Sequence, residues 1–207
     1  MWKLSILVLL SFGTSLAALQ PRCEITCHIR FAKEGSGLLT LRIQASNFGT
    51  IAKAFGFEDR AITTRQFGTN LTKSFEKLGF TEITNRISTN SGIDLEYSYK
   101  FFTPSNVLDW LDDNNFVAGK FIKWSDSSVE LNFVLAESYP DPILLIFEFS
   151  EYTISDANGV LMSTNKLSWR MNENSKGLYL RARADASSRP ETPSVGGAAQ
   201  TTKNKSE

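Results

Sequence analysis

Apolar and polar residues alternate along the stretch CEITCHIRF, from Cys23 to Phe31, and this alternation constrains the fold more than any other feature. Every second side chain of a strand points to the same face of its sheet, so a sustained period of two predicts a half-buried β-strand. A turn sequence, KEGSG at 33–37, follows, and the alternation then returns in LLTLRIQA at 38–45. We therefore expect an antiparallel hairpin whose apolar side chains face one core.

Three later segments have a helical spacing of apolar residues. They are SNFGTIAKAFGF (46–57), TNLTKSFEKLGF (69–80) and SNVLDWLDDNN (105–115). In the second segment Thr69 is suited to cap the helix and Gly79 to end it. The third segment directly follows Pro104, which is a common residue at the start of a helix.

The remaining segments predict strands. A second hairpin is expected over 81–89 and 92–102, and further strands over 116–124, 128–137, 143–155, 165–171 and 177–184. The run ILLIFEF at 143–149 is almost continuously apolar, which favours a central strand covered on both faces. The fold class expected is α+β: one domain over residues 22–185, with a mostly antiparallel sheet of about eight to nine strands and two or three helices packed on one face.

The first seventeen residues have the features of a secretory signal peptide. Lys3 supplies a positive start, the apolar run LSILVLLSF (4–12) is too short to span a bilayer, and Ser15 and Ala17 suit cleavage after Ala17. We therefore expect residues 1–17 to be removed and the mature chain, without a transmembrane segment, to be exported to the periplasm, the cell envelope or the extracellular space.

Two features at the ends of the domain complete this prediction. Acylation of Cys23, as in a bacterial lipoprotein, is the alternative to cleavage after Ala17, and Arg22 disfavours it because the peptidase requires small residues before the cysteine. After Ala186 the composition changes to Ser, Pro, Gly, Thr and Lys, so residues 186–207 are expected to form a disordered tail.

The charge of the chain argues against one class of partner. The 22 basic residues are balanced by 22 acidic ones, whereas a protein that binds nucleic acid needs a basic surface to displace phosphate counterions. We expect no nucleic-acid partner.

Cys23, Cys27 and His28 are the first candidates for metal or nucleophile chemistry. In a strand the two cysteines lie on one face but about 13 Å apart, too far for a disulfide or for a shared metal ion. They are expected to be free, buried thiols. His28, the one histidine of the sequence, points to the opposite face, and no serine stands in a nucleophile elbow. We expect no catalytic residues, no metal and no cofactor, and therefore no enzyme.

Acidic and amide side chains offer weaker candidates. Asp109, Asp112 and Asp113 share one helix face and are interpreted as a solvated charge cluster rather than a cation site. The turn beginning at Asp156 lacks the glycine and glutamate of a calcium loop. Asn70, in the triplet NLT, is a glycosylation acceptor only in a eukaryotic source.

Aromatic residues on the inward strand faces are the leading binding candidates. They are Tyr97, Tyr99, Phe101, Phe133, Phe147, Phe149 and Trp169. They could line a cavity for an apolar or lipid-like ligand, or they could fill a solid core. Two successive inward tyrosines suggest a face that meets something partly polar, such as water in a cavity mouth or a lipid head group, because a buried hydroxyl needs a hydrogen-bond partner. The alternative is that both hydroxyls reach backbone acceptors or the sheet edge.

The last third of the chain resembles the LppM-like family of bacterial envelope lipoproteins. The resemblance rests on the Asn158–Gly159 turn, a strand carrying Trp169, a polar loop with Gly177 and the closing strand LYLRARA, together with the strand that bears Cys23. It implies a sheet wrapped round helices, similar to helix-grip lipid binders, and an envelope role involving lipid or glycolipid.

These observations lead to two functional hypotheses. The first is an exported, non-enzymatic envelope domain that binds an apolar or lipid-like small molecule between sheet and helices. The alternative is a structural or protein-interaction domain of the cell surface with a solid aromatic core, whose partner would be another envelope protein. A cavity of several hundred Å³ lined by the aromatics would favour the first hypothesis.

Overall fold

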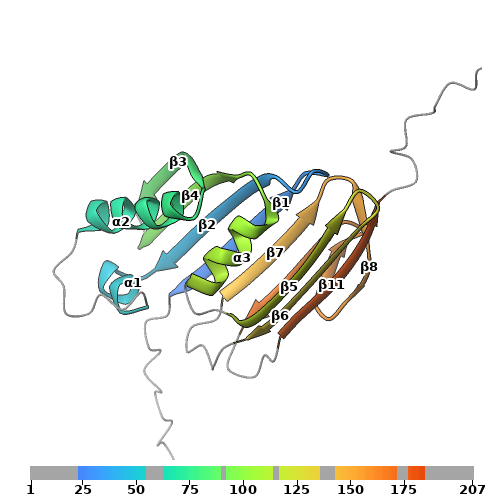
Figure 1. Ribbon diagram of the computed structural model, residues 1–207. Coiled ribbons are helices and arrows are strands. Elements are labelled where there is room, and N and C mark those ends of the chain that lie inside the picture. Colours follow the sequence, from blue (N-terminus) through green and yellow to red (C-terminus); the bar gives the residue numbers. More distant parts are fainter. Residues whose placement is uncertain are drawn as a thin grey trace, which may run out of the picture.

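The computed structural model describes residues 23–54, 63–89, 92–113, 117–135, 143–171 and 177–184 (Figure 1). Within these ranges the chain forms eleven strands and three helices, which confirms the α+β class. The helices are α1 (Phe48–Ala54), α2 (Thr64–Lys77) and α3 (Pro104–Asp113). The strands are β1 (Glu24–Phe31), β2 (Gly37–Ala45), β3 (Thr81–Ser88), β4 (Ile93–Phe101), β5 (Val117–Ser125), β6 (Ser128–Leu135), β7 (Ile143–Phe149), β8 (Tyr152–Ala157), β9 (Val160–Ser163), β10 (Lys166–Met171) and β11 (Gly177–Ala184). The predicted signal peptide (1–17) and tail (186–207) lie outside the described residues.

The strands form two sheets, where the sequence had predicted one sheet of eight or nine strands. The larger sheet has seven strands in the order β3-β4-β2-β1-β7-β10-β9, and the smaller has four in the order β5-β6-β11-β8. Alternation in a sequence shows which side chains share a face, but it does not show to which sheet a strand belongs. The predicted hairpins β1–β2 and β3–β4 are both present and antiparallel.

One pairing within the larger sheet joins distant parts of the chain. β1 lies between β2, which is antiparallel to it, and β7, which runs parallel to it. β7 is therefore a central strand, as predicted. However, its inner residues are buried while Leu144 and Ile146, on the outer face, are only half-buried, so the described part of the chain covers one face of β7 and not both.

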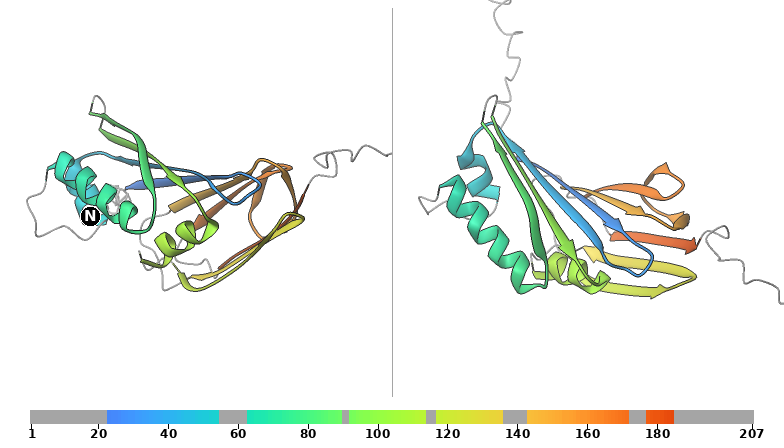
Figure 2. Two further views of the ribbon diagram at one scale, coloured as in Figure 1. Left: turned by 45° about the horizontal axis from the view of Figure 1, so that its top comes forward. Right: turned by 90° about the horizontal axis from the view of Figure 1, so that it is seen from above.

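The smaller sheet and the helices lie on the same face of the larger sheet (Figure 2). The four-stranded sheet packs against the half that contains β1, β7 and β10, whereas α1 and α2 lie against the half that contains β2, β4 and β3. α3 lies between them and the smaller sheet, in contact with β4 and β5. The helices share that face with a second sheet, which the sequence had not predicted.

Aromatic rings fill the space between the two sheets. Phe31 of β1 packs against Phe101, Phe149 and Trp124, with ring centroids 5.2, 5.4 and 5.1 Å away. Tyr152 packs against both Trp124 and Phe149. The chain has a large buried aromatic core.

α2 begins earlier than the sequence predicted. Thr63, rather than Thr69, caps it: its Oγ1 accepts a hydrogen bond from the backbone N–H of Gln66, and the Gln66 side chain accepts one from the N–H of Thr63. This reciprocal capping box satisfies two groups that the start of a helix leaves unpaired. The helix ends at Lys77, and Gly79, two residues later, has a φ of +81°, which favours glycine.

No helix in the described ranges combines the length and the apolarity needed to cross a membrane.

Candidate ligand groove

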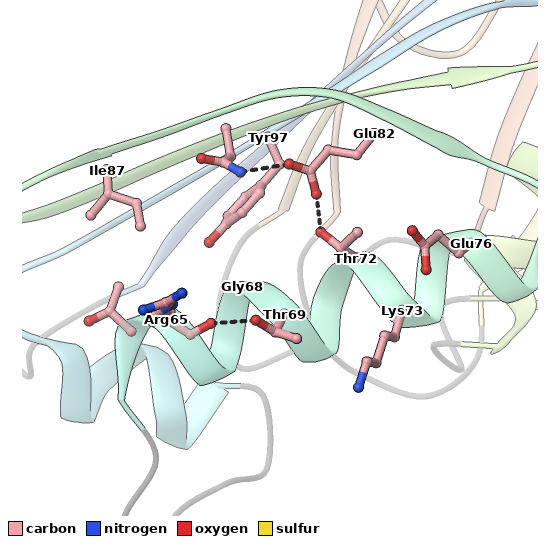
Figure 3. Close-up of a pocket in the computed structure, with 11 residues that line it drawn as sticks. Arg65, Gly68, Thr69, Thr72, Lys73, Glu76, Glu82, Ile87 and Tyr97 are labelled. Atoms are coloured by element: carbon pink, nitrogen blue, oxygen red, sulfur yellow. Dashed lines mark hydrogen bonds between the residues drawn. The ribbon is translucent and has the colours of Figure 1, made fainter.

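α2 and the strands β3 and β4 lie at the end of the larger sheet that the smaller sheet does not cover (Figure 1). A groove lies between this helix and these strands (Figure 3). Its volume is about 410 Å³, which is within the range of small-molecule sites. The residues that line it are Thr64, Arg65, Gly68, Thr69, Thr72, Lys73, Glu76, Glu82, Asn85, Ile87 and Tyr97. Most of them are polar, so the groove differs from the aromatic cavity that the sequence predicted.

Tyr97 joins the groove to the aromatic core. Its ring is buried, with 2% of the residue exposed, and stacks beside Tyr99 at 6.4 Å. Its hydroxyl has no hydrogen-bond partner among the described residues. Burial, and then the charge of Glu82, raises the pKa of Tyr97, so its hydroxyl stays protonated and can donate.

Gly68 of α2 makes room for this hydroxyl. A Cβ atom at position 68 would lie 2.6 Å from Tyr97 Oη. Glycine inside a helix costs about 1 kcal/mol relative to alanine. The helix therefore carries a destabilising residue at the point where the Tyr97 hydroxyl meets it, as Figure 3 shows.

Tyr99, by contrast, belongs to a complete hydrogen-bond chain. Thr72 Oγ1 donates to Glu82 Oε2 at 2.5 Å, and Tyr99 Oη lies 3.2 Å from the same Thr72 oxygen. Because the Thr72 hydrogen is already used, Tyr99 is the donor to Thr72. Asn85 Nδ2 donates to the other carboxylate oxygen of Glu82 at 2.6 Å. Burial raises the pKa of Tyr99, although the Thr72 contact opposes this.

A β-bulge in β3 places the two strand residues of this network. The pairing of β3 with β4 shifts between Glu82 and Thr84, so Ile83 is an extra residue. As a result Glu82 and Asn85, three positions apart, both face α2, whereas regular alternation would turn them to opposite faces. Bulges re-aim side chains in this way and are frequent beside functional sites.

The groove carries charges of both signs. Arg65 stands in the first turn of α2, and Glu76 stands toward the other end of the helix. Figure 3 shows the carboxylates of Glu76 and Glu82 on the strand side of α2, whereas Lys73 points away from the strands. Thus the strand-facing wall runs from one cation, past Tyr97, to two carboxylates.

The seven predicted binding residues do not come together at one site. Of them, only Tyr97 lines the groove. Tyr99 stands directly behind it, and Phe101 and Phe149 both pack on Phe31 in the core between the sheets. Phe133 and Phe147 form a separate pair at 6.2 Å, and Trp169 is buried on β10. Their ligand-binding role stays a prediction; their observed place is in the packed interior.

The remaining groove residues were missed by the sequence analysis. Thr72 and Gly68 lay in or beside a predicted helix without any sign that they face a strand. One signal was available: an isolated glycine inside a helical pattern usually has a packing or functional reason. Glu82 and Asn85 could not be paired from the sequence, because the bulge that aligns them leaves no pattern.

The cysteines and the histidine occupy the faces predicted for them. Cys23 and Cys27 are fully buried and are not joined to each other by a disulfide, and burial strongly raises the pKa of the free Cys27 thiol. His28 lies on the outer face, where its Nε2 is 2.8 Å from Glu148 Oε2. Lys166 Nζ contacts the same carboxylate at 3.2 Å.

Two carboxylates of the acidic cluster on α3 are bridged by a lysine of β5. Lys120 Nζ lies 2.8 Å from Asp109 and 3.0 Å from Asp112. The acidic neighbours raise the pKa of Lys120, first through the hydrogen bond with Asp109. The cation at this cluster is thus a lysine ammonium group. Among the described residues, no group of histidine, cysteine or acidic side chains is placed to hold a metal ion.

No protein-family model and no curated protein matches the chain. A solved structure is similar to it: the folded domain of the LppM protein of Mycobacterium tuberculosis, determined by NMR, with 12% sequence identity and a TM-score of 0.48. The match covers 86% of this chain and 100% of the LppM domain. The resemblance to LppM that the sequence pattern predicted is therefore confirmed as a structural resemblance, a distant one that assigns no ligand and no residue role.

Proposed function

We propose that this domain is a non-enzymatic binding protein that takes the polar end of a lipid-like amphiphile into the groove between α2 and the β3–β4 hairpin. The observation that carries the proposal is the hydroxyl of Tyr97, a residue that lines the groove. This hydroxyl is buried and has no hydrogen-bond partner among the described residues. A buried donor without a partner costs about 1–3 kcal/mol, so a ligand that supplies the partner recovers that energy on binding.

The arrangement around Tyr97 supports binding at this place. In this proposal α2 contacts the ligand from one side and the β3–β4 part of the sheet contacts it from the other. Tyr99 keeps the Tyr97 ring in position, since it stacks on both Tyr97 and Phe75, the latter at 4.0 Å. Ile87, 47% exposed, gives the groove an apolar margin for the upper part of an alkyl chain.

The proposed role is binding without chemistry, outside the cytoplasm. The described residues that line the groove include no histidine and no cysteine, and their chemistry suits hydrogen bonding. Export rests on the signal-peptide features of residues 1–17, and it puts the domain where envelope or extracellular lipids are its partners.

Uptake of a fluorescent fatty acid or phospholipid at micromolar concentration tests the proposal. The wild-type domain should bind the probe, and Tyr97→Phe should weaken uptake about tenfold for the loss of one buried hydrogen bond, with an unchanged fold. Tyr152→Phe is the matched control, because Tyr152 is a buried tyrosine far from the groove lining. A folded wild-type domain that takes up neither probe would exclude this function.

The alternative, a protein-interaction domain, is favoured by a different observation. Val160, Leu161 and Met162 of the edge strand β9 are 70%, 55% and 56% exposed, and consecutive exposed apolar residues on an edge favour pairing with another chain. If this function holds, Leu161→Lys should abolish retention of a native partner on the immobilised domain while leaving probe uptake unchanged.

A further inference from the structure

The order of polar groups along the groove indicates which chemical groups the proposed ligand carries. Thr64 and Arg65 form the first turn of α2, where the helix dipole adds a positive potential to the guanidinium charge. Thr72, which donates to Glu82, follows two helical turns later, about 10 Å along the axis. Tyr97 Oη meets the helix between these two points, at Gly68.

The two ends of the groove therefore select groups of opposite charge. An anion is stabilised at the Arg65 end, where a guanidinium offers several donors. A donor or cation is stabilised at the other end, where the Glu82 carboxylate faces α2 and the Glu76 carboxylate lies on the strand side of that helix (Figure 3). Glu82 receives hydrogen bonds from Thr72 and Asn85, both neutral side chains, so its negative charge is not balanced by them.

Tyr97 fits between these ends because a phenol both donates and accepts. It can donate to the anionic group on the Arg65 side and accept from a donor on the Glu82 side. A ligand with only negative charge would place part of that charge beside two carboxylates, and like charges at close range are unfavourable.

Building on the proposed function, we propose that the groove recognises a dipolar head group: a phosphate or similar anion directed to Arg65 and an ammonium group directed to Glu82 and Glu76. Zwitterionic phospholipids carry these two groups on one head. The free head group carries the same chemistry, so the experiment must separate the lipid from its soluble fragment.

Calorimetric titration with short-chain lipids at concentrations where they stay monomeric tests the inference. Dihexanoyl phosphatidylethanolamine should bind about tenfold more tightly than dihexanoyl phosphatidylglycerol, which has the same chains and phosphate without the ammonium, as expected for one charged hydrogen bond. O-phosphoethanolamine, the free head group, should bind more weakly than the lipid. If it binds equally well, the dipolar recognition stands and the natural ligand is the soluble group.

Single substitutions assign each end of the groove. Glu76→Gln should weaken the ethanolamine lipid and leave the glycerol lipid unchanged, whereas Arg65→Gln should weaken both. Glu82→Gln should act as Glu76→Gln does, and its melting temperature reports whether the Thr72 contact survives. Lys77→Gln removes a positive charge from the last turn of the same helix, outside the groove lining, so it is the matched control and should change neither affinity.

The outcomes separate this inference from the proposed function. Equal affinity for the two lipids, or tighter binding of the glycerol lipid, would overturn the dipolar head group while leaving amphiphile binding intact. Binding of neither lipid, together with no uptake of the fluorescent probes, would overturn both.

Discussion

Two buried tyrosines, one between the sheets and one in the groove, are treated differently by the fold. Tyr152 Oη lies 3.0 Å from the carbonyl oxygen of Lys33 and 2.9 Å from that of Ser125, and the neighbouring Trp124 Nε1 also donates to Lys33. Tyr97 Oη has no partner among the described residues. In the core between the sheets, the Tyr152 hydroxyl has hydrogen-bond partners within the protein. A buried hydroxyl without such a partner beside a groove therefore indicates a ligand-binding site.

The largest expected effect on stability comes from removing an aromatic ring from the core between the two sheets. Phe149 is fully buried and contacts Phe31, Trp124 and Tyr152. Phe149→Ala should lower the free energy of unfolding by about 3–5 kcal/mol, the usual cost of deleting a buried aromatic ring. Denaturant unfolding measures it. A loss under 1 kcal/mol would mean that the interior between the sheets is loosely packed.

A smaller effect compares the two hydroxyls directly. Tyr152→Phe removes the donor to the Ser125 carbonyl and one of the two donors to the Lys33 carbonyl, which keeps Trp124, and should cost about 1–3 kcal/mol. Tyr97→Phe breaks no hydrogen bond with a described residue and should be neutral or slightly stabilising. The same unfolding experiment measures both variants. Equal losses would show that Tyr97 has a partner within the chain and would remove the contrast.

A substitution at the contact between Gly68 and Tyr97 should have a smaller effect on stability. Gly68→Ala gains about 1 kcal/mol of helix propensity but forces a methyl group against Tyr97 Oη, and we expect a net loss of about 1 kcal/mol. In the double variant with Tyr97→Phe the obstructing oxygen is gone, so the protein should recover most of that loss. Additive effects in this double-mutant cycle would contradict the contact.

The smallest effect concerns the outer face, which belongs to neither region. Burial lowers the pKa of His28 below its ordinary 6.5, although the hydrogen bond with Glu148 opposes this. A depressed pKa in the folded state means that stability is present above pH 6.5 and is lost as the pH falls through the folded value. The melting temperature should therefore decline slightly between pH 6.5 and about pH 5. The corresponding loss in the free energy of unfolding is less than about 1 kcal/mol.

His28→Gln serves as the control for that decline, because it keeps a polar group opposite Glu148 without a titrating one. His28 is the one histidine of the sequence, so the variant should flatten the curve in this range. An undiminished decline in the variant would assign it to other groups.

Much of the fold was predictable because the deciding signals are local. The alternation at Cys23–Phe31 placed the cysteines inward and His28 outward, and the strand patterns gave both hairpins. The start of α2 was placed too late, at Thr69, because Gly68 interrupts the helical pattern, while the Thr63–Gln66 capping box upstream was not recognised. The division into two sheets was not predictable, since it depends on pairings between β1 and β7 and between β6 and β11, which are distant in sequence.

The candidate site was predictable only at Tyr97, from the cost of burying a hydroxyl. The other six aromatics have the same composition signal, but five of them pack against other rings and Trp169 is buried on β10. Arg65, Glu76 and Glu82 are ordinary surface charges in the sequence. Their relation emerges only when α2 is laid against β3 and a bulge turns Glu82 toward Thr72.

The parallel pairing of β1 with β7 also affects the order in which contacts form during folding. His28 on β1 and Glu148 on β7 are 120 positions apart in the chain. During synthesis β1 and β2 can pair early, but the other edge of β1 stays open until β7 has emerged, and closing so long a loop is entropically costly. An open, apolar strand edge invites association with other chains in the interval. We therefore expect refolding to be slow and its yield to fall as the protein concentration rises, with His28 and Glu148 coming together among the last contacts.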